Sequence, residues 1–72
     1  MNSKQILEIA KALVKKSPDL RLGQAIFIVA NKNYPDITNE LTGSEFDCFY
    51  QDAGINSFLR ELEEMKKIKG YE

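Results

Sequence analysis

Two segments near the ends of the chain carry hydrophobic residues at the three- and four-residue spacing of amphipathic helices. From Ser3 to Lys16 one face collects Ile6, Ala10, Leu13 and Val14, with Ile9 at its flank. From Ile55 to about Lys69 the corresponding stripe is Ile55, Phe58, Leu59, Leu62 and Met65. Charged residues cover the opposite face of each segment. In the segment from Ile55 to Lys69 they are Arg60, Glu61, Glu63, Glu64, Lys66 and Lys67. The pattern predicts one helix over each segment, with Ser3 as the N-cap of the first.

The segment that begins near Leu20 is apolar around most of its circumference. A continuous stripe runs through Leu22, Ala25, Ile26, Val29 and Ala30, and Phe27 and Ile28 widen it. Such a helix belongs in the middle of a fold or in an oligomer interface. The run AIFIVA (residues 25–30) also fits a short buried strand, but the chain offers no second strand to pair with it. We expect a helix from about Asp19 or Leu20 to Asn31, with Asp19 as its N-cap and Gly23 where another helix approaches closely.

A short third helix is predicted from about Pro35 to Leu41. Proline suits the first helical position, and Asp36 adds negative charge to the first turn, where the helix dipole favours it. Gly43 then ends the helix. The sequence thus predicts a single all-α domain over residues 1–72, a compact bundle of about four helices. An ordered acidic and aromatic corner, Thr42–Leu59, leads into the last helix.

The composition favours a soluble protein of a reducing compartment. Hydrophobic residues make up 43% and charged residues 29% of the 72 residues, as in ordinary globular chains. The single cysteine cannot form an internal disulfide, which argues against secretion. The longest apolar run, residues 25–30, is far too short to span a membrane. We therefore expect a cytoplasmic protein with no membrane segment.

The residue pattern argues against catalysis, metal binding and cofactors. The chain contains no histidine, so Cys48 lacks the usual base that activates a thiol, and a multi-ligand zinc site is excluded. Glu45, Asp47 and Asp52 do not have the regular spacing of a calcium loop. We expect no enzyme activity, no metal site and no cofactor, and we interpret Cys48 as a buried structural residue.

Three stretches resemble a group of small proteins encoded mainly by bacteriophages. They are RLGQAIF (residues 21–27), NYPDITNELTGSEFDCFYQD (residues 33–52) and INSFLREL (residues 55–62). The shared pattern is Arg-Leu-Gly-Gln, then Pro and Leu or Ile, Gly-Thr/Ser, Asp-Pro-Phe-Tyr with an acid, and Phe-Leu. Cys48 stands where the pattern has proline. These proteins carry no assigned biochemical activity, so the resemblance implies a phage origin more than a function.

The corner has a structural and a functional interpretation. In the first, Asp47 accepts hydrogen bonds from the backbone N–H groups that follow it, and Phe49 fills the core. In the second, the corner is a protein-binding surface, because aromatic residues are the usual anchors of interfaces. Arg21 could then contact a partner or form a structural ion pair with Asp47 or Asp52. The candidate partner-binding residues are Arg21, Gln24, Phe46, Asp47, Tyr50, Gln51 and Asp52.

The resemblance also implies a class of partner. Small phage accessory proteins commonly act by occupying the surface of a host or defence protein, so we expect a modulator or inhibitor of such a protein. If the apolar residues of the second helix and the corner exceed what the core needs, they could instead pair two copies of this chain in a homodimer. The alternative is weak, non-specific nucleic-acid binding through basic residues at the helix ends. These are Lys11, Lys15, Lys16, Arg21, Lys66, Lys67 and Lys69. A net charge of −1 and an apolar second helix argue against it.

Overall fold

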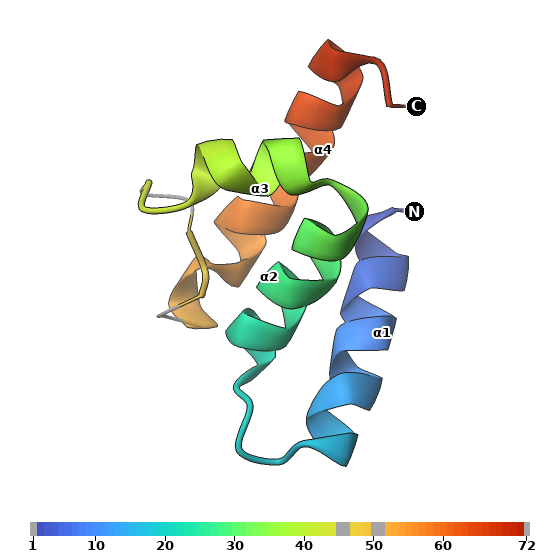
Figure 1. Cartoon of the computed structure of the whole chain (residues 1–72), viewed down its shortest axis with the longest axis vertical. Coiled ribbons are helices and arrows are strands. Elements are labelled where there is room, and N and C mark those ends of the chain that lie inside the picture. Colours follow the sequence, from blue (N-terminus) through green and yellow to red (C-terminus); the bar gives the residue numbers. More distant parts are fainter. Residues whose placement is uncertain (1, 45–46, 50–51, 72) are drawn as a thin grey trace.

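The chain folds into a bundle of α-helices, as the sequence predicts. The computed structural model describes residues 2–44, 47–49 and 52–71, and none of these residues lies in a strand. Within them are four α-helices and a short 3-10 turn (Figure 1). The elements are α1 (Ser3–Lys16), α2 (Leu22–Asn33), α3 (Pro35–Leu41), η1 (Asp52–Gly54) and α4 (Ile55–Lys69).

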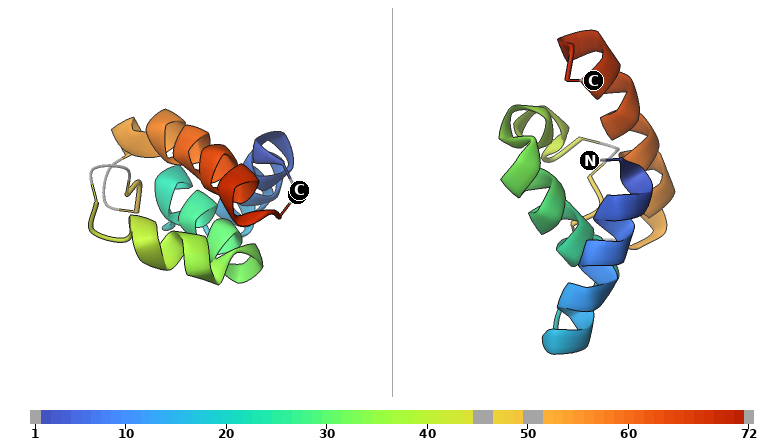
Figure 2. Two further views of the ribbon diagram at one scale, coloured as in Figure 1. Left: turned by 90° about the horizontal axis from the view of Figure 1, so that it is seen from above. Right: turned by 90° about the vertical axis from the view of Figure 1, so that its right-hand side faces the viewer.

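Helix α2 lies in the middle of the bundle. Helices α1 and α2 run antiparallel and form a hairpin, whose connection lies at one end of the molecule (Figure 1). Viewed from above, α1, α3 and α4 surround α2 on three sides (Figure 2). The apolar circumference of α2 in the sequence is explained by this central position. None of the helices in the described part of the chain combines the length and hydropathy needed to cross a lipid bilayer.

Helix α1 begins with a capping box centred on Asn2, so the predicted N-cap Ser3 is wrong by one residue. The N–H of Gln5 donates to Oδ1 of Asn2, and the N–H of Asn2 donates to Oε1 of Gln5, both at 2.9 Å. Ser3 is instead the first residue of α1, and its hydroxyl donates a hydrogen bond to Oε2 of Glu63 at 2.8 Å. This bond ties the first turn of α1 to α4.

Helix α2 begins later and ends later than predicted. Its N-cap is Arg21 and not Asp19, since the N–H of Leu20 closes a turn onto the carbonyl of Ser17 at 2.9 Å and keeps this segment outside the helix. The N–H of Arg21 donates to Oε1 of Gln24 at 3.0 Å, which fixes the start of the helix. The other end, at Asn33, lies beyond the predicted Asn31.

The buried core is built from all four helices, from Tyr34 between α2 and α3, and from Cys48 of the corner. The predicted stripes supply most of it, and α3 and α4 have the predicted bounds. Phe58 and Leu62 of α4 and Ile26 of α2 are fully buried, whereas Phe27 and Leu59 are partly buried around them. The full set of buried apolar residues is Ile6, Ala10, Ala25, Ile26, Val29, Ala30, Tyr34, Ile37, Leu41, Cys48, Phe58 and Leu62.

The last turns of α4 pack against α3 more closely than the sequence indicates. Lys66, which we expected on the solvent side, is buried, with Nζ 5.1 Å from the ring centroid of Tyr34 and 3.5 Å from the carboxylate of Glu63. Tyr34 lies between α2 and α3, and its ring meets that of Tyr71 edge to face, with centroids 5.0 Å apart. Lys69 bridges to Glu40 at 2.6 Å. These contacts fasten the C-terminal end of α4 to α3.

Candidate functional site

Asp47 organises the corner from within. Its Oδ2 accepts a hydrogen bond from the N–H of Gly43 at 2.8 Å, and its Oδ1 accepts one from the N–H of Phe49 at 2.9 Å. The expected bonding of Asp47 to the following backbone is therefore confirmed. Gly43 has a φ of +77°, a conformation that glycine adopts without strain, so the turn after α3 depends on it. Both carboxylate oxygens of Asp47 thus bind the chain's own backbone.

Asp52 fastens the corner to the first turn of α2. Its Oδ1 accepts a hydrogen bond from the N–H of Gly23 at 2.9 Å and lies 3.8 Å from Nη1 of Arg21. The Nη2 group of Arg21 donates to the carbonyl of Phe49 at 2.6 Å. A carboxylate here is favoured twice, because it satisfies an amide that has no partner within the helix and lies at the positive end of the helix dipole. Arg21 and Asp52 therefore form the structural ion pair that the sequence left open.

Cys48 is buried against the same turn. Its Sγ donates to the carbonyl of Gly23 at 3.3 Å and is fully enclosed. Burial, reinforced by the charge of Asp47, raises the pKa of the thiol to about 12. A side chain on Gly23 would collide with the carbonyl of Cys48 and would lie 2.7 Å from Oδ1 of Asp52. Gly23 thus marks a close approach, but the approaching segment is the corner and not a helix.

The candidate binding residues divide into those that hold the fold together and those outside the described residues. Arg21, Gln24, Asp47 and Asp52 lie around the first turn of α2 and the corner, and each makes an intramolecular contact. Phe49 packs its ring edge to face on Phe27, with centroids 5.5 Å apart, and is only partly buried. Phe46, Tyr50 and Gln51 lie outside the described residues. The described part of the corner therefore acts as scaffold.

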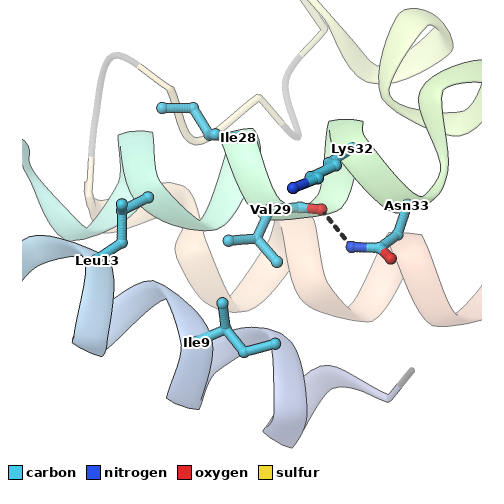
Figure 3. Close-up of a pocket in the computed structure, with 6 residues that line it drawn as sticks. All are labelled: Ile9, Leu13, Ile28, Val29, Lys32 and Asn33. Carbon is cyan, nitrogen blue, oxygen red and sulfur yellow. Dashed lines mark hydrogen bonds between the residues drawn. The ribbon is translucent and has the colours of Figure 1, made fainter.

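A different apolar surface lies between α1 and α2. A hollow of about 400 Å³ is lined by Ile9, Leu13, Ile28, Val29, Lys32 and Asn33 (Figure 3). A second hollow of about 200 Å³ adjoins it and is lined by Ile9, Ala12, Leu13 and Lys16. We call these two hollows the α1–α2 groove. Ile9 and Ile28 retain 44% and 42% of their accessible surface, although both are large aliphatic side chains.

The charged side chains among the described residues that line this groove are both lysines. Lys16 lies in the last turn of α1, and Lys32 lies in the last turn of α2. Because the two helices are antiparallel, the last turn of α1, which carries Lys16, and the last turn of α2, which carries Lys32, lie at opposite ends of the groove (Figure 1). The side-chain amide of Asn33 donates to the carbonyl of Val29 at 2.8 Å at the Lys32 end. The surface is thus an apolar trough with positive charge at each end.

No protein-family model, curated protein or solved structure matches this chain. Among the described residues, no group of three His, Cys, Asp or Glu side chains is placed to hold a metal ion. The surfaces whose chemistry bears on a function are therefore the corner and the α1–α2 groove.

Proposed function

We propose that this chain is a protein-binding module that acts through the α1–α2 groove. The observation that carries the proposal is the exposure of Ile9 and Ile28 on one apolar surface of two packed helices. Contiguous exposed apolar surface on a small globular protein is typical of an interaction site. In 72 residues, where a core is difficult to build, burying these side chains inside would have added stability.

The biological setting that we propose follows from the resemblance to phage-encoded proteins. In that setting the chain is an accessory protein in the cytoplasm of the infected cell, where it modulates or inhibits a host or defence protein without an enzymatic step. The proposed binding surface is the groove and not the described part of the corner, because Asp47, Asp52 and Arg21 bond to the chain's own backbone.

The internal contacts of the basic residues disfavour the nucleic-acid alternative. Lys66 is buried beside Tyr34, and Lys69 pairs with Glu40 and Asp36. Arg21 is bonded to the carbonyl of Phe49. Phosphate binding would require these side chains to leave their partners. Three of the seven basic residues that supported nucleic-acid binding thus have structural roles.

Site-specific photo-crosslinking in host cells tests the proposed function. A photoreactive amino acid replaces Ile28 in one variant and the exposed Glu64 of α4 in a control variant. We expect a discrete protein adduct from position 28 that is absent at position 64. Adducts with nucleic acid, or the same adducts from both positions, would contradict the proposal.

A further inference from the structure

We infer that the partner presents an amphipathic α-helix whose apolar stripe fills the α1–α2 groove and whose acidic residues meet Lys16 and Lys32. This inference rests on the proposed function and adds the chemical class of the partner's contact segment. It is drawn from the shape of the groove and from the charge at its two ends.

The shape of the groove suits a third helix. Two antiparallel helices present a trough between their side-chain ridges, and a helix packs into such a trough along its length. Ile9 and Leu13 are four residues apart on α1 and form one wall, while Ile28 on α2 forms the other (Figure 3). Val29 lies on the floor between them. Apolar residues at i, i+3 or i+4, and i+7 of a partner helix would fit between these walls.

The length of the groove sets the length of the helix. Along α1, Lys16 lies about 10 Å from Ile9 at the rise of an α-helix. Along the antiparallel α2, Lys32 lies about 6 Å beyond Ile28 toward the other end of the groove. A partner helix must therefore extend over about three turns, or roughly 16 Å, to bring both of its ends near the lysines.

The charge of the groove selects an acidic partner over a second copy of this chain. Two identical grooves packed face to face would gather two copies each of Lys16 and Lys32 around one apolar centre. Among the described residues that line the two hollows there is no Asp or Glu whose carboxylate could offset these positive charges. Like charges juxtaposed across an interface oppose association. A helix with Asp or Glu at both ends of its stripe instead pairs each lysine with an opposite charge.

Selection from a library of helices tests this inference while the partner itself is still unidentified. The probe is a displayed library of alanine-rich helices of about 14 residues, or about 21 Å. Its stripe positions vary among apolar residues, and its end positions vary among Asp, Glu, Gln, Lys and Arg. We expect selection on the full chain to enrich Asp and Glu at both ends. A selection that yields no binders, or binders without an acidic preference, would overturn the inference.

A charge-swap variant then locates the contact. For the selected acidic helix, Lys16→Glu with Lys32→Glu should weaken binding about tenfold, the scale of two exposed ion pairs turned into repulsive pairs. The counterpart helix with Lys at its ends should gain affinity for this variant. Lys15→Glu with Lys67→Glu is the matched control, because it makes the same charge change in the last turns of α1 and α4, outside the groove lining.

A second double variant, with a smaller change in charge, tests whether weaker binding results from a loss of folding. Lys16→Gln with Lys32→Gln removes the attraction without placing negative charge at the helix C-termini, and should weaken binding a few-fold. If the control pair weakens binding as much as the groove pair, the helix does not bind in the groove and the inference fails. Sedimentation of the free chain adds a further check: a dimer that Ile28→Asp dissociates would make a second copy the occupant.

The two proposals fail on different results. A protein adduct from position 28 together with no acidic preference in the selection would leave the binding function standing and remove the acidic helix. Absence of any adduct from position 28 would remove the binding function itself, and with it the inference about the partner.

Discussion

The carboxylate of Asp52 accepts a hydrogen bond from the backbone N–H of Gly23 at 2.9 Å, across 29 residues of chain. The acceptor lies just before α4, and the donor lies in the first turn of the central helix α2. The corner therefore caps α2 through a residue that is distant in the sequence, whereas helix caps are usually residues adjacent to the helix. This relationship explains why the most irregular part of the chain is packed against its most apolar helix.

We predict that Gly23→Ala destabilises the protein by about 1–3 kcal/mol, although alanine is the better helix former. The new methyl group would collide with the carbonyl of Cys48 and crowd Oδ1 of Asp52. Urea unfolding followed by circular dichroism measures the change. Asn56→Ala, at an exposed position in the first turn of α4, is the control and should stay within about 0.5 kcal/mol of wild type. Increased stability of Gly23→Ala would mean that the corner does not approach α2 as described.

We predict that Asp52→Ala costs about 1–2 kcal/mol, the usual cost of losing a helix cap. Asp52→Asn should cost less, because the amide oxygen can still accept the hydrogen bond from Gly23 and the ion pair with Arg21 is half-exposed. The same unfolding experiment compares the two variants. Equal losses would mean that the charge of Asp52, and not its hydrogen bond, holds the corner.

Features that depend on nearby residues could be predicted from the sequence. Helices α1, α3 and α4 follow from periodicity and end signals a few residues apart, and their bounds match the structure except that the N-cap of α1 is Asn2 and not Ser3. The predicted start of α2 is wrong because Asp19 looks like a local cap, whereas Gln24 and the distant Asp52 fix the first turn. A pattern of neighbouring residues cannot predict the hydrogen bond between Gly23 and Asp52, which are 29 residues apart in the sequence.

Burial that depends on packing between helices could not be predicted in the same way. Lys66 occupies a solvent-facing position on a helical projection, and only the placement of Tyr34 beside α4 buries it. The α1–α2 groove escapes prediction for a related reason. Ile9 lies at the flank of its own stripe and Ile28 at the edge of another, and the antiparallel pairing brings them to one surface. The signal in the sequence is the pair of large aliphatic residues left at the edges of two stripes.

We predict that the thiol of Cys48 is unreactive in the native protein. Burial and the charge of Asp47 raise its pKa from 9.0 to about 12, so the thiolate population at mildly alkaline pH falls about a thousandfold, before steric protection is counted. The folded protein favours the protonated thiol. The contribution of Cys48 to the free energy of unfolding is therefore fully present below pH 9 and is lost as the pH rises toward 12. Disulfide-exchange labelling measures the rate, with the urea-unfolded chain as the fast reference. Comparable rates in the two states would show that Cys48 is accessible.

We predict that Glu63 contributes to the loss of stability in acid. Burial opposes ionisation of its carboxyl, but the hydrogen bond from Ser3 and the charge of Lys66 outweigh it and hold the pKa below 4.5. The contribution is therefore present above pH 4.5 and is lost as the pH falls through the lower native value. Glu63→Gln should flatten the acid limb of the stability curve, measured by urea unfolding from about pH 6 to about pH 3. Glu64→Gln, on the exposed side of α4, should leave that limb as in wild type.

Two isoleucines of α2, Ile26 and Ile28, should respond in opposite ways to the same substitution. Ile26 is fully buried, so Ile26→Ala should cost about 2–5 kcal/mol of stability. Ile28 retains 42% of its surface in the α1–α2 groove, so Ile28→Ala should cost less than about 1 kcal/mol. If the groove binds the partner, Ile28→Ala should instead weaken that complex by about tenfold or more, as the loss of a buried interface anchor does. Unfolding curves and titration with the crosslinked partner separate the two effects. An Ile28→Ala protein that is folded and binds as wild type would move the interface away from the groove.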